Sequence, residues 1–128
     1  MSILTCEFEY DSVMTIRSIN YSIYKVFENT NAFDVSNRIA SACIKRGKGL
    51  AALIDNVAVA EFERNRGYGT LIVTRLINDA ELLNVNRLFG NIYNNDIDTP
   101  EKLARFDHFY KKLGFELDYD KLKLYKNL

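Results

Sequence analysis

Two arginines and two glycines stand close together in the hexapeptide Arg-Asn-Arg-Gly-Tyr-Gly, residues 64–69. Arginine side chains form paired hydrogen bonds with phosphate, and glycine lets the backbone adopt positive φ or approach a ligand closely. The hexapeptide follows an apolar run and precedes a helical pattern. Its amides would therefore lie at a helix N-terminus, where unpaired N–H groups and the helix dipole attract anions. The sequence thus predicts an anion-binding loop built on four residues: Arg64, Arg66, Gly67 and Gly69.

Two common phosphate-binding motifs do not fit this loop. The Walker A motif requires a lysine after its last glycine, and Thr70 follows Gly69 here. The dinucleotide fingerprint requires a third small residue, where this chain has Ile72, and an acidic residue at the end of the next strand, which residues 87–93 lack. A tight strand-to-helix turn with two solvated arginines and no ligand is the remaining alternative.

The elements around the loop alternate between strand and helix. Residues 50–59 form an apolar run typical of a strand that is covered on both faces, and residues 70–84 place apolar side chains on one helical stripe. Residues 87–93 predict the next strand, and a polar loop follows over residues 94–98. Asp98 with Glu101 resembles a capping box, with Pro100 in the first turn of a helix that ends at Gly114.

The two ends of the chain add further elements. Residues 3–10 alternate apolar and polar side chains and predict a strand. Residues 15–27 fit a helical stripe but are rich in strand-forming residues, so we favour a strand there. Asp34 predicts the N-cap of a short helix over residues 35–46. Residues 115–128 predict a strand or a short hairpin, so the order of elements indicates an α/β or α+β fold.

Composition narrows the class of protein. The 128 residues suit one domain, and 17 basic and 17 acidic residues give no net charge to attract nucleic acid or anionic lipid. The sequence has no apolar run long enough to span a membrane. Cys6 and Cys43 stand far apart, which argues against a structural metal and favours a reduced, cytoplasmic setting, although a disulfide between them stays open. We therefore expect neither nucleic acid nor membrane as a partner.

Two segments resemble the GNAT superfamily of N-acetyltransferases. Residues 57–76 resemble its acetyl-CoA-binding segment, with the signature Arg/Gln-x-x-Gly-x-Gly/Ala after a strand that ends in valines. Further along, His-Phe-Tyr-Lys-Lys-Leu-Gly-Phe-Glu resembles the family's Phe/Leu-Tyr-x-x-x-Gly-Phe segment, with Tyr110, Gly114 and Phe115 in register. The resemblance covers the chain from about residue 50 to its end. It implies a single GNAT-like domain over residues 1–128, built on a mixed, twisted sheet with helices on both faces.

The resemblance also implies roles for parts of the chain. Residues 50–128 would bind acetyl-CoA, and residues 1–49 would form a variable acceptor-side part. The loop amides would hold the pyrophosphate, and the strand before the loop would pair with the pantetheine arm and polarise the thioester carbonyl. Tyr68 could stack on adenine or cover the helix start. The implied cofactor-binding residues are Val57, Ala58, Val59, Arg64, Asn65, Arg66, Gly67, Tyr68, Gly69 and Thr70.

Catalytic candidates come partly from the resemblance. In the family register Tyr110 would protonate the departing CoA thiolate, whereas its helical spacing alone favours a core tyrosine. The family often carries Asn and Ala where this chain has Leu103 and Phe106. An amine acceptor must lose a proton, and we consider three bases and a water-mediated route. We favour Asp55, because it interrupts an apolar strand, over Glu61 and Glu63.

The expected function is that of an acetyl-CoA-dependent N-acetyltransferase. It would transfer the acetyl group directly to a primary amine, which could be a protein lysine, an N-terminus or a small amine. The alternative is a GNAT-fold interaction protein that binds a partner with little or no catalysis. An exposed C-terminal strand would permit a homodimer formed through sheet edges.

Overall fold

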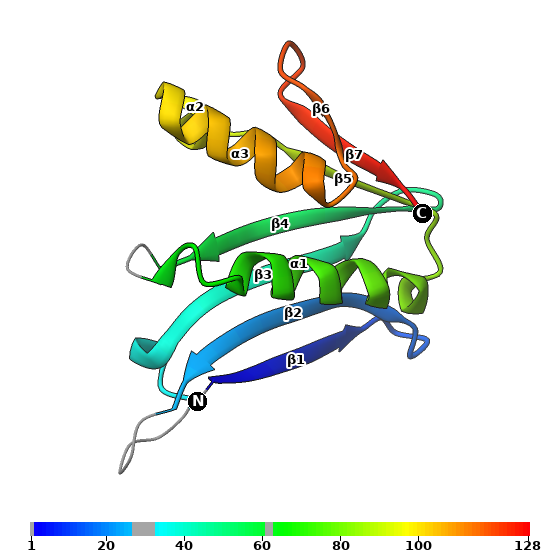
Figure 1. Cartoon of the computed structure of the whole chain (residues 1–128). Helices are drawn as coiled ribbons and strands as arrows, with labels where there is room; N and C mark the ends of the chain where they lie inside the picture. The colour runs from blue at the N-terminus through cyan, green and yellow to red at the C-terminus, as the bar shows by residue number, and fades with distance from the viewer. Residues whose placement is uncertain (1, 27–32, 61–62) are drawn as a thin grey trace.

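The computed structural model describes residues 2–26, 33–60 and 63–128. These residues form one seven-stranded sheet with the strand order β1-β2-β3-β4-β5-β7-β6 (Figure 1). Its strands are β1 (Ser2–Tyr10), β2 (Ile16–Lys25), β3 (Arg38–Arg46), β4 (Ala51–Val59), β5 (Arg87–Asn91), β6 (Glu116–Asp118) and β7 (Lys123–Asn127). The described helices are η1 (Val35–Asn37), α1 (Tyr68–Asp79), η3 (Ala80–Leu83), α2 (Asn94–Ile97) and α3 (Pro100–Lys112).

The sheet is mixed, because β4 and β5 run parallel while every other neighbouring pair is antiparallel. Parallel neighbours require a crossover connection, and α1 supplies it between β4 and β5. The expected single α+β domain with a mixed sheet is therefore confirmed. The favoured strand over residues 15–27 is also confirmed by β2, although residue 27 itself lies outside the described residues.

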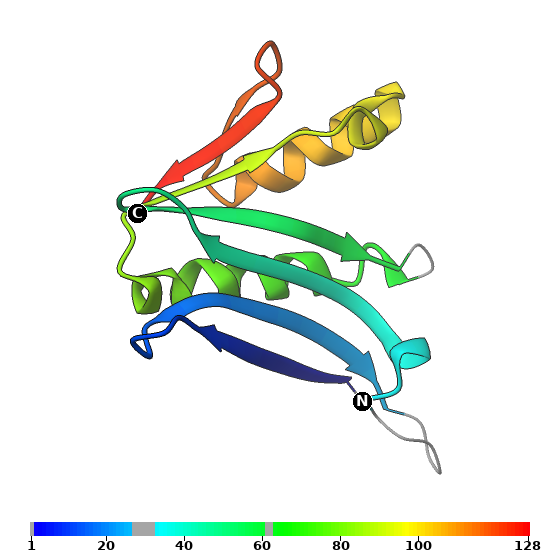
Figure 2. The same cartoon turned by 180° about the vertical axis from the view of Figure 1, so that it is seen from behind.

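The described long helices lie on one side of the sheet rather than on both. Figures 1 and 2 show α1 and α3 in front of the sheet in one view and behind it in the other. Tyr21 on β2 faces this side, since its hydroxyl donates a hydrogen bond of 2.8 Å to Asp79 of α1. The connection between β1 and β2 is a turn over residues 11–15, held by Asp11, so no helix follows the first strand.

The hydrophobic core lies between α1 and the sheet. The predicted apolar stripe over residues 70–84 is confirmed, because its four side chains are at most 1% exposed: Ile72 and Leu76 on α1, and Ala80 and Leu83 on η3. They pack against apolar side chains of the central strands, such as Ile19 and Ile44, which are fully buried. This packing fixes the start of α1 beside the end of β4.

The helix predicted over residues 35–46 is wrong. Asp34 does act as an N-cap, accepting a hydrogen bond from the Ser36 amide, but the helix is the single turn η1. The chain then continues as β3, which pairs with β2 and β4 along its length. Its side chains Ile39, Ala40 and Cys43 are buried although they do not share one face. Pairing with two neighbouring strands has overridden local helix signals, as is common for central strands.

The start of the last helix also differs from the prediction. Thr99, not Asp98, is the N-cap of α3, and its hydroxyl accepts a hydrogen bond of 3.2 Å from the Lys102 amide. The predicted loop before it contains the short helix α2. The predicted end is confirmed, since Gly114 has a φ of 88°, in the left-handed region that favours glycine after a helix.

The C-terminal residues form the hairpin β6–β7, and β7 lies between β5 and β6. The C-terminal strand is therefore an inner strand, and the premise that it offers a free edge for a homodimer is wrong. The edges of the sheet are β1 and the short β6. Cys6 and Cys43 are both free, so they form no disulfide. No helix in the described part of the chain is long and apolar enough to cross a membrane.

Candidate functional site

The predicted anion loop stands at the start of α1, as the sequence indicates. Gly67 is the N-cap residue, with a φ of 83°, and the described residues provide no side-chain cap for the first turn of α1. Asn65 also has a positive φ, 64°, which asparagine tolerates better than most residues. A Cβ built on Gly67 would meet no atom within 4 Å. The amides at this helix start are therefore free to bind an anion.

Gly69 serves packing as well as ligand approach. A Cβ built there would lie 3.1 Å from Cε1 of Phe109 and 3.5 Å from a methyl carbon of Val59. Because the contact with Phe109 would be tighter than an ordinary van der Waals distance, Gly69 lets α1 approach α3 closely. The sequence reasoning assigned both glycines to the ligand, whereas the structure gives Gly69 this second reason.

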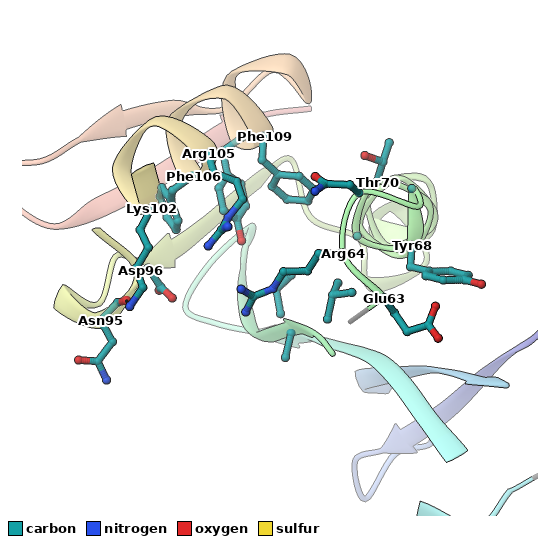
Figure 3. Close-up of a pocket in the computed structure, with 17 residues that line it drawn as sticks. Glu63, Arg64, Tyr68, Thr70, Asn95, Asp96, Lys102, Arg105, Phe106 and Phe109 are labelled. Atoms are coloured by element: carbon teal, nitrogen blue, oxygen red, sulfur yellow. Dashed lines mark hydrogen bonds between the residues drawn. The ribbon is translucent and has the colours of Figure 1, made fainter. Parts of the chain in front are cut away.

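A cavity of about 470 Å³ opens between the loop, the end of β4 and α3 (Figure 3). Nine of the ten predicted cofactor-binding residues line it: Val57, Ala58, Val59, Arg64, Asn65, Gly67, Tyr68, Gly69 and Thr70. Arg66 does not line it, and its guanidinium lies 3.4 Å from the Glu63 carboxylate instead. In Figure 3 the Tyr68 ring extends away from α3. Apart from Arg66, the structure thus brings the predicted set together around one cavity.

The far wall of this cavity comes from residues that the sequence analysis left out. They belong to α2 and α3: Asn95, Asp96, Lys102, Arg105, Phe106 and Phe109. Arg105 has no predicted role, because nothing in its local sequence sets it apart from the other charged residues of the helix. The helical spacing of Lys102 and Arg105 indicates a shared face, but only the crossing of α3 over the end of β4 shows that this face meets a cavity.

The backbone of β4 is left unpaired beside the cavity. β4 pairs with β5 only over residues 51–53 with residues 87–89. On its other side it pairs with β3 as far as Val59, with an irregularity near Asn56, whose φ is 54°. No strand in the described part of the chain pairs with residues 57–59 on the β5 side, so an extended ligand could pair there with the backbone groups that face away from β3.

Glu63 forms ion pairs with Lys25 and Arg66 and is not well suited as a base. It is 3% exposed, and its Oε1 accepts a hydrogen bond of 2.9 Å from Nζ of Lys25 on β2. Its Oε2 has no hydrogen-bond partner among the described residues, with the Arg66 guanidinium at 3.4 Å. The hydrogen bond from Lys25 lowers the pKa of this carboxyl group, which weakens it as a proton acceptor. Glu61, another candidate base, lies outside the described residues.

Tyr110 stands at the junction of this cavity with a second one. Its side chain is packed among three rings, with centroid distances of 4.7 Å to Phe106, 4.9 Å to Phe109 and 5.5 Å to Phe115. Its hydroxyl forms no hydrogen bond within the described residues. Burial, assisted by the negative charge of Asp96, raises the pKa of Tyr110 well above its usual range. The phenol therefore keeps its proton at neutral pH.

The second cavity, of about 230 Å³, shares four lining residues with the first: Val57, Asp96, Phe106 and Tyr110. Among the described residues, the charged ones that line it are Asp55 and Asp96. Asp55 is partly buried, and its Oδ1 accepts a hydrogen bond of 2.9 Å from the Asn56 amide. Asp55 thus lies apart from the loop and beside the same tyrosine.

Comparisons with known proteins agree with this geometry. The sequence matches the model of the acetyltransferase (GNAT) family over residues 24–115. No curated protein matches it significantly. The fold is similar to that of an IAA acetyltransferase from Bacillus cereus ATCC 14579, with a TM-score of 0.68 and 14% identity over 100% of both chains.

Two further solved structures are similar. One is a Bacillus subtilis acetyltransferase in complex with CoA, with a TM-score of 0.62 and 18% identity over 88% of this chain and 78% of that one. The other is a GNAT-family acetyltransferase from Staphylococcus aureus Mu50, with a TM-score of 0.65 and 14% identity over 87% of this chain and 68% of that one. The family model covers well over half of the sequence, and the fold agrees with it. The chain therefore belongs to the acetyltransferase (GNAT) family.

Proposed function

We propose that the protein is an acetyl-CoA-dependent N-acetyltransferase that passes the acetyl group directly to a primary amine. The observation that carries this proposal is the position of Tyr110 where two cavities meet. One cavity contains the anion loop, and the other contains two carboxylates and no basic residue. A transfer between two substrates requires such a junction, with a proton donor beside both.

The first cavity fits coenzyme A. The free amides at the start of α1, together with Arg64, suit the diphosphate, and the space beside Gly67 would be filled by any side chain there. The unpaired backbone of residues 57–59 suits the amide groups of the pantetheine arm. The similar Bacillus subtilis structure contains CoA, which supports the same ligand here. When bound, acetyl-CoA supplies an activated thioester.

Tyr110 is proposed as the proton donor to the departing sulfur. A group that donates a proton must be protonated at the working pH, and the raised pKa of Tyr110 ensures this. Its hydroxyl also has no hydrogen-bond partner among the described residues, so its proton can point toward the thioester. The surrounding phenylalanine rings hold the phenol in one orientation and exclude water from its face.

The second cavity is proposed as the acceptor site. A primary amine is protonated in water near pH 7, with a pKa of about 10.4 for lysine, and must lose a proton before it can attack. Asp55 and Asp96 would attract the ammonium group, and Asp55 would accept its proton. All the residues that line the two cavities belong to residues 50–128, which supports the cofactor-binding role of that part. The acceptor-side role of residues 1–49 and a cytoplasmic location stay predictions.

Calorimetric titration with acetyl-CoA, followed by an acceptor screen, tests the proposal. Binding in the micromolar range, with CoA release stimulated by a polyamine or a lysine peptide, is the expected result. A folded protein that binds neither acetyl-CoA nor CoA would contradict it. The Asp55→Asn variant should retain cofactor binding and lose turnover, and equal turnover would remove Asp55 from the mechanism.

Phe106 favours a second candidate function, an interaction protein with the same fold. The family pattern often has a small alanine at this position, and here a ring packs 4.7 Å from Tyr110 in the wall shared by the two cavities. A bulky side chain there narrows the passage between cofactor and acceptor. Tight binding of CoA with no turnover of any amine, in both the parent and Phe106→Ala, would favour this candidate.

A further inference from the structure

The basic residues around the first cavity differ in whether they have an acidic partner. Arg66 is paired with Glu63, and Lys102 is paired with Asp98, with Nζ 3.0 Å from Oδ1. Arg64 and Arg105 have no ion pair or hydrogen bond within the described part of the chain. The cavity therefore contains two guanidinium groups that no acidic side chain among the described residues pairs with.

These two guanidinium groups approach the same space from opposite walls. Arg64 comes from the loop before α1, and Arg105 comes from α3. Figure 3 shows both side chains extending into the cavity toward one another. Two like charges held near each other repel, and an anion bound between them would be attracted by both and would offset that repulsion. A planar guanidinium also matches the oxygens of a phosphate in a paired arrangement.

This position is separate from the anion site at the start of α1. The free amides belong to the first turn of α1, whereas Arg105 stands on α3, across the cavity. Coenzyme A has two groups of negative charge, the diphosphate and the phosphate on the 3′-oxygen of its ribose. If the loop amides bind the diphosphate, the 3′-phosphate is the group left for the second position.

We propose that Arg64 and Arg105 bind the 3′-phosphate of coenzyme A, so that the protein distinguishes CoA from dephospho-CoA. The proposal rests on the cofactor assigned above, since it names a second contact of the same ligand. Arg105 would then be a specificity residue, and Arg64 would be shared between the two phosphate positions. Lys102, held by Asp98 and by the carbonyl oxygen of Asn95, would contribute charge without direct contact.

The test compares the affinity of CoA with that of dephospho-CoA, measured by calorimetry without any acceptor. The parent protein should bind CoA at least about tenfold more tightly, as expected for a charge-assisted contact with phosphate. Arg105→Gln should reduce this preference to less than about threefold and leave the affinity for dephospho-CoA unchanged. Lys112→Gln is the matched control, because it removes one exposed positive charge from the same helix outside the cavity, and it should keep the preference.

Three outcomes would overturn the proposal in distinguishable ways. An equal affinity of the parent protein for CoA and dephospho-CoA would show that the 3′-phosphate is not bound. If Arg105→Gln lowered the affinity for both ligands equally, Arg105 would either contact the diphosphate or be needed for the stability of the fold. A thermal melt of the variant would distinguish these two roles. Failure of the folded parent protein to bind either ligand would refute the proposed cofactor itself.

Discussion

Gly67 and Gly49 form a matched pair that tests the anion loop. Both have positive φ, 83° for Gly67 and 64° for Gly49, and a Cβ built on either would meet no atom within 4 Å. Gly67 lines the first cavity, whereas Gly49 lies in the turn between β3 and β4 and lines neither cavity. Replacing each by alanine therefore imposes a similar backbone strain at two sites, of which only one belongs to the proposed cofactor site.

The expected loss of stability is similar for the two variants. A residue with a Cβ in the left-handed region costs roughly 1–2 kcal/mol, and no steric clash adds to this at either site. With an unfolding entropy of about 2.1 cal/mol/K per residue, the chain of 128 residues should lose about 4–7 °C in Tm. The affinity for CoA should differ, because the new methyl group of Gly67→Ala shifts the amides of the helix start. Loss of one charge-assisted hydrogen bond weakens binding by at least about tenfold.

Differential scanning calorimetry and CoA titration measure the two quantities on the same samples. We expect both variants to melt earlier, Gly67→Ala to bind CoA weakly and Gly49→Ala to bind it as the parent does. Parental CoA affinity in Gly67→Ala, with the expected fall in Tm, would refute the assignment of these amides to the cofactor. An unchanged Tm in both variants would refute the strain argument instead.

Three further experiments test other parts of the structure. Tyr110→Phe should lower kcat by about 100-fold or more and change the affinity for CoA by less than about twofold, as expected for the loss of a proton donor. An unchanged kcat in steady-state assays would mean that Tyr110 serves only in packing. The carboxylate of Glu63, whose pKa Lys25 lowers, stabilises the fold above the ordinary glutamate pKa of about 4.3 and loses this contribution as pH falls through its lowered pKa. In Glu63→Gln the free energy of unfolding, measured by urea titration, should therefore fall less steeply as the pH is lowered into the acid range. The same pH dependence in the variant and the parent would contradict this. Thr99→Ala should lower the free energy of unfolding by about 1 kcal/mol, because it removes the N-cap of α3. Asp98→Ala removes only an exposed ion pair and should lower it by less than about 0.5 kcal/mol. If urea titrations gave the reverse order, Asp98 would be the cap.

The part of the fold after residue 50 could be predicted because its signals are local. Gly67 needs a positive φ, Gly114 needs another after the last turn of α3, and the apolar stripe of α1 repeats with helical spacing. Each of these signals depends on a few neighbouring residues. The loop at the start of α1 and Tyr110 were found for the same reason, because each lies in a short segment with a recognisable register.

The errors arise where long-range pairing decides the structure. Residues 38–46 become β3 because β2 and β4 bind both of its edges, and no feature of the local sequence contains that information. β7 is an inner strand because it pairs with both β5 and β6, and this pairing is also not encoded in the local sequence. The same limit hid Arg105, since its role follows from the place where α3 crosses the cavity rather than from its helical face. Arg66 shows the converse: its spacing suits the anion, but a buried carboxylate lies close enough to pair with it.

The two cavities differ in the charge of their lining residues, and this difference bears on which acceptor the proposed reaction prefers. Basic side chains on the walls of the first cavity, Arg64 and Arg105 among them, favour an anionic ligand. The charged residues that line the second cavity in the described part of the chain are Asp55 and Asp96, so this cavity would repel phosphate and attract a cation. The buried Tyr110 and the partly buried Val57 line both cavities and so lie where the two meet. An amine with two or more positive charges should therefore be a better acceptor than a neutral or acidic one. The advantage should shrink as salt screens the carboxylates.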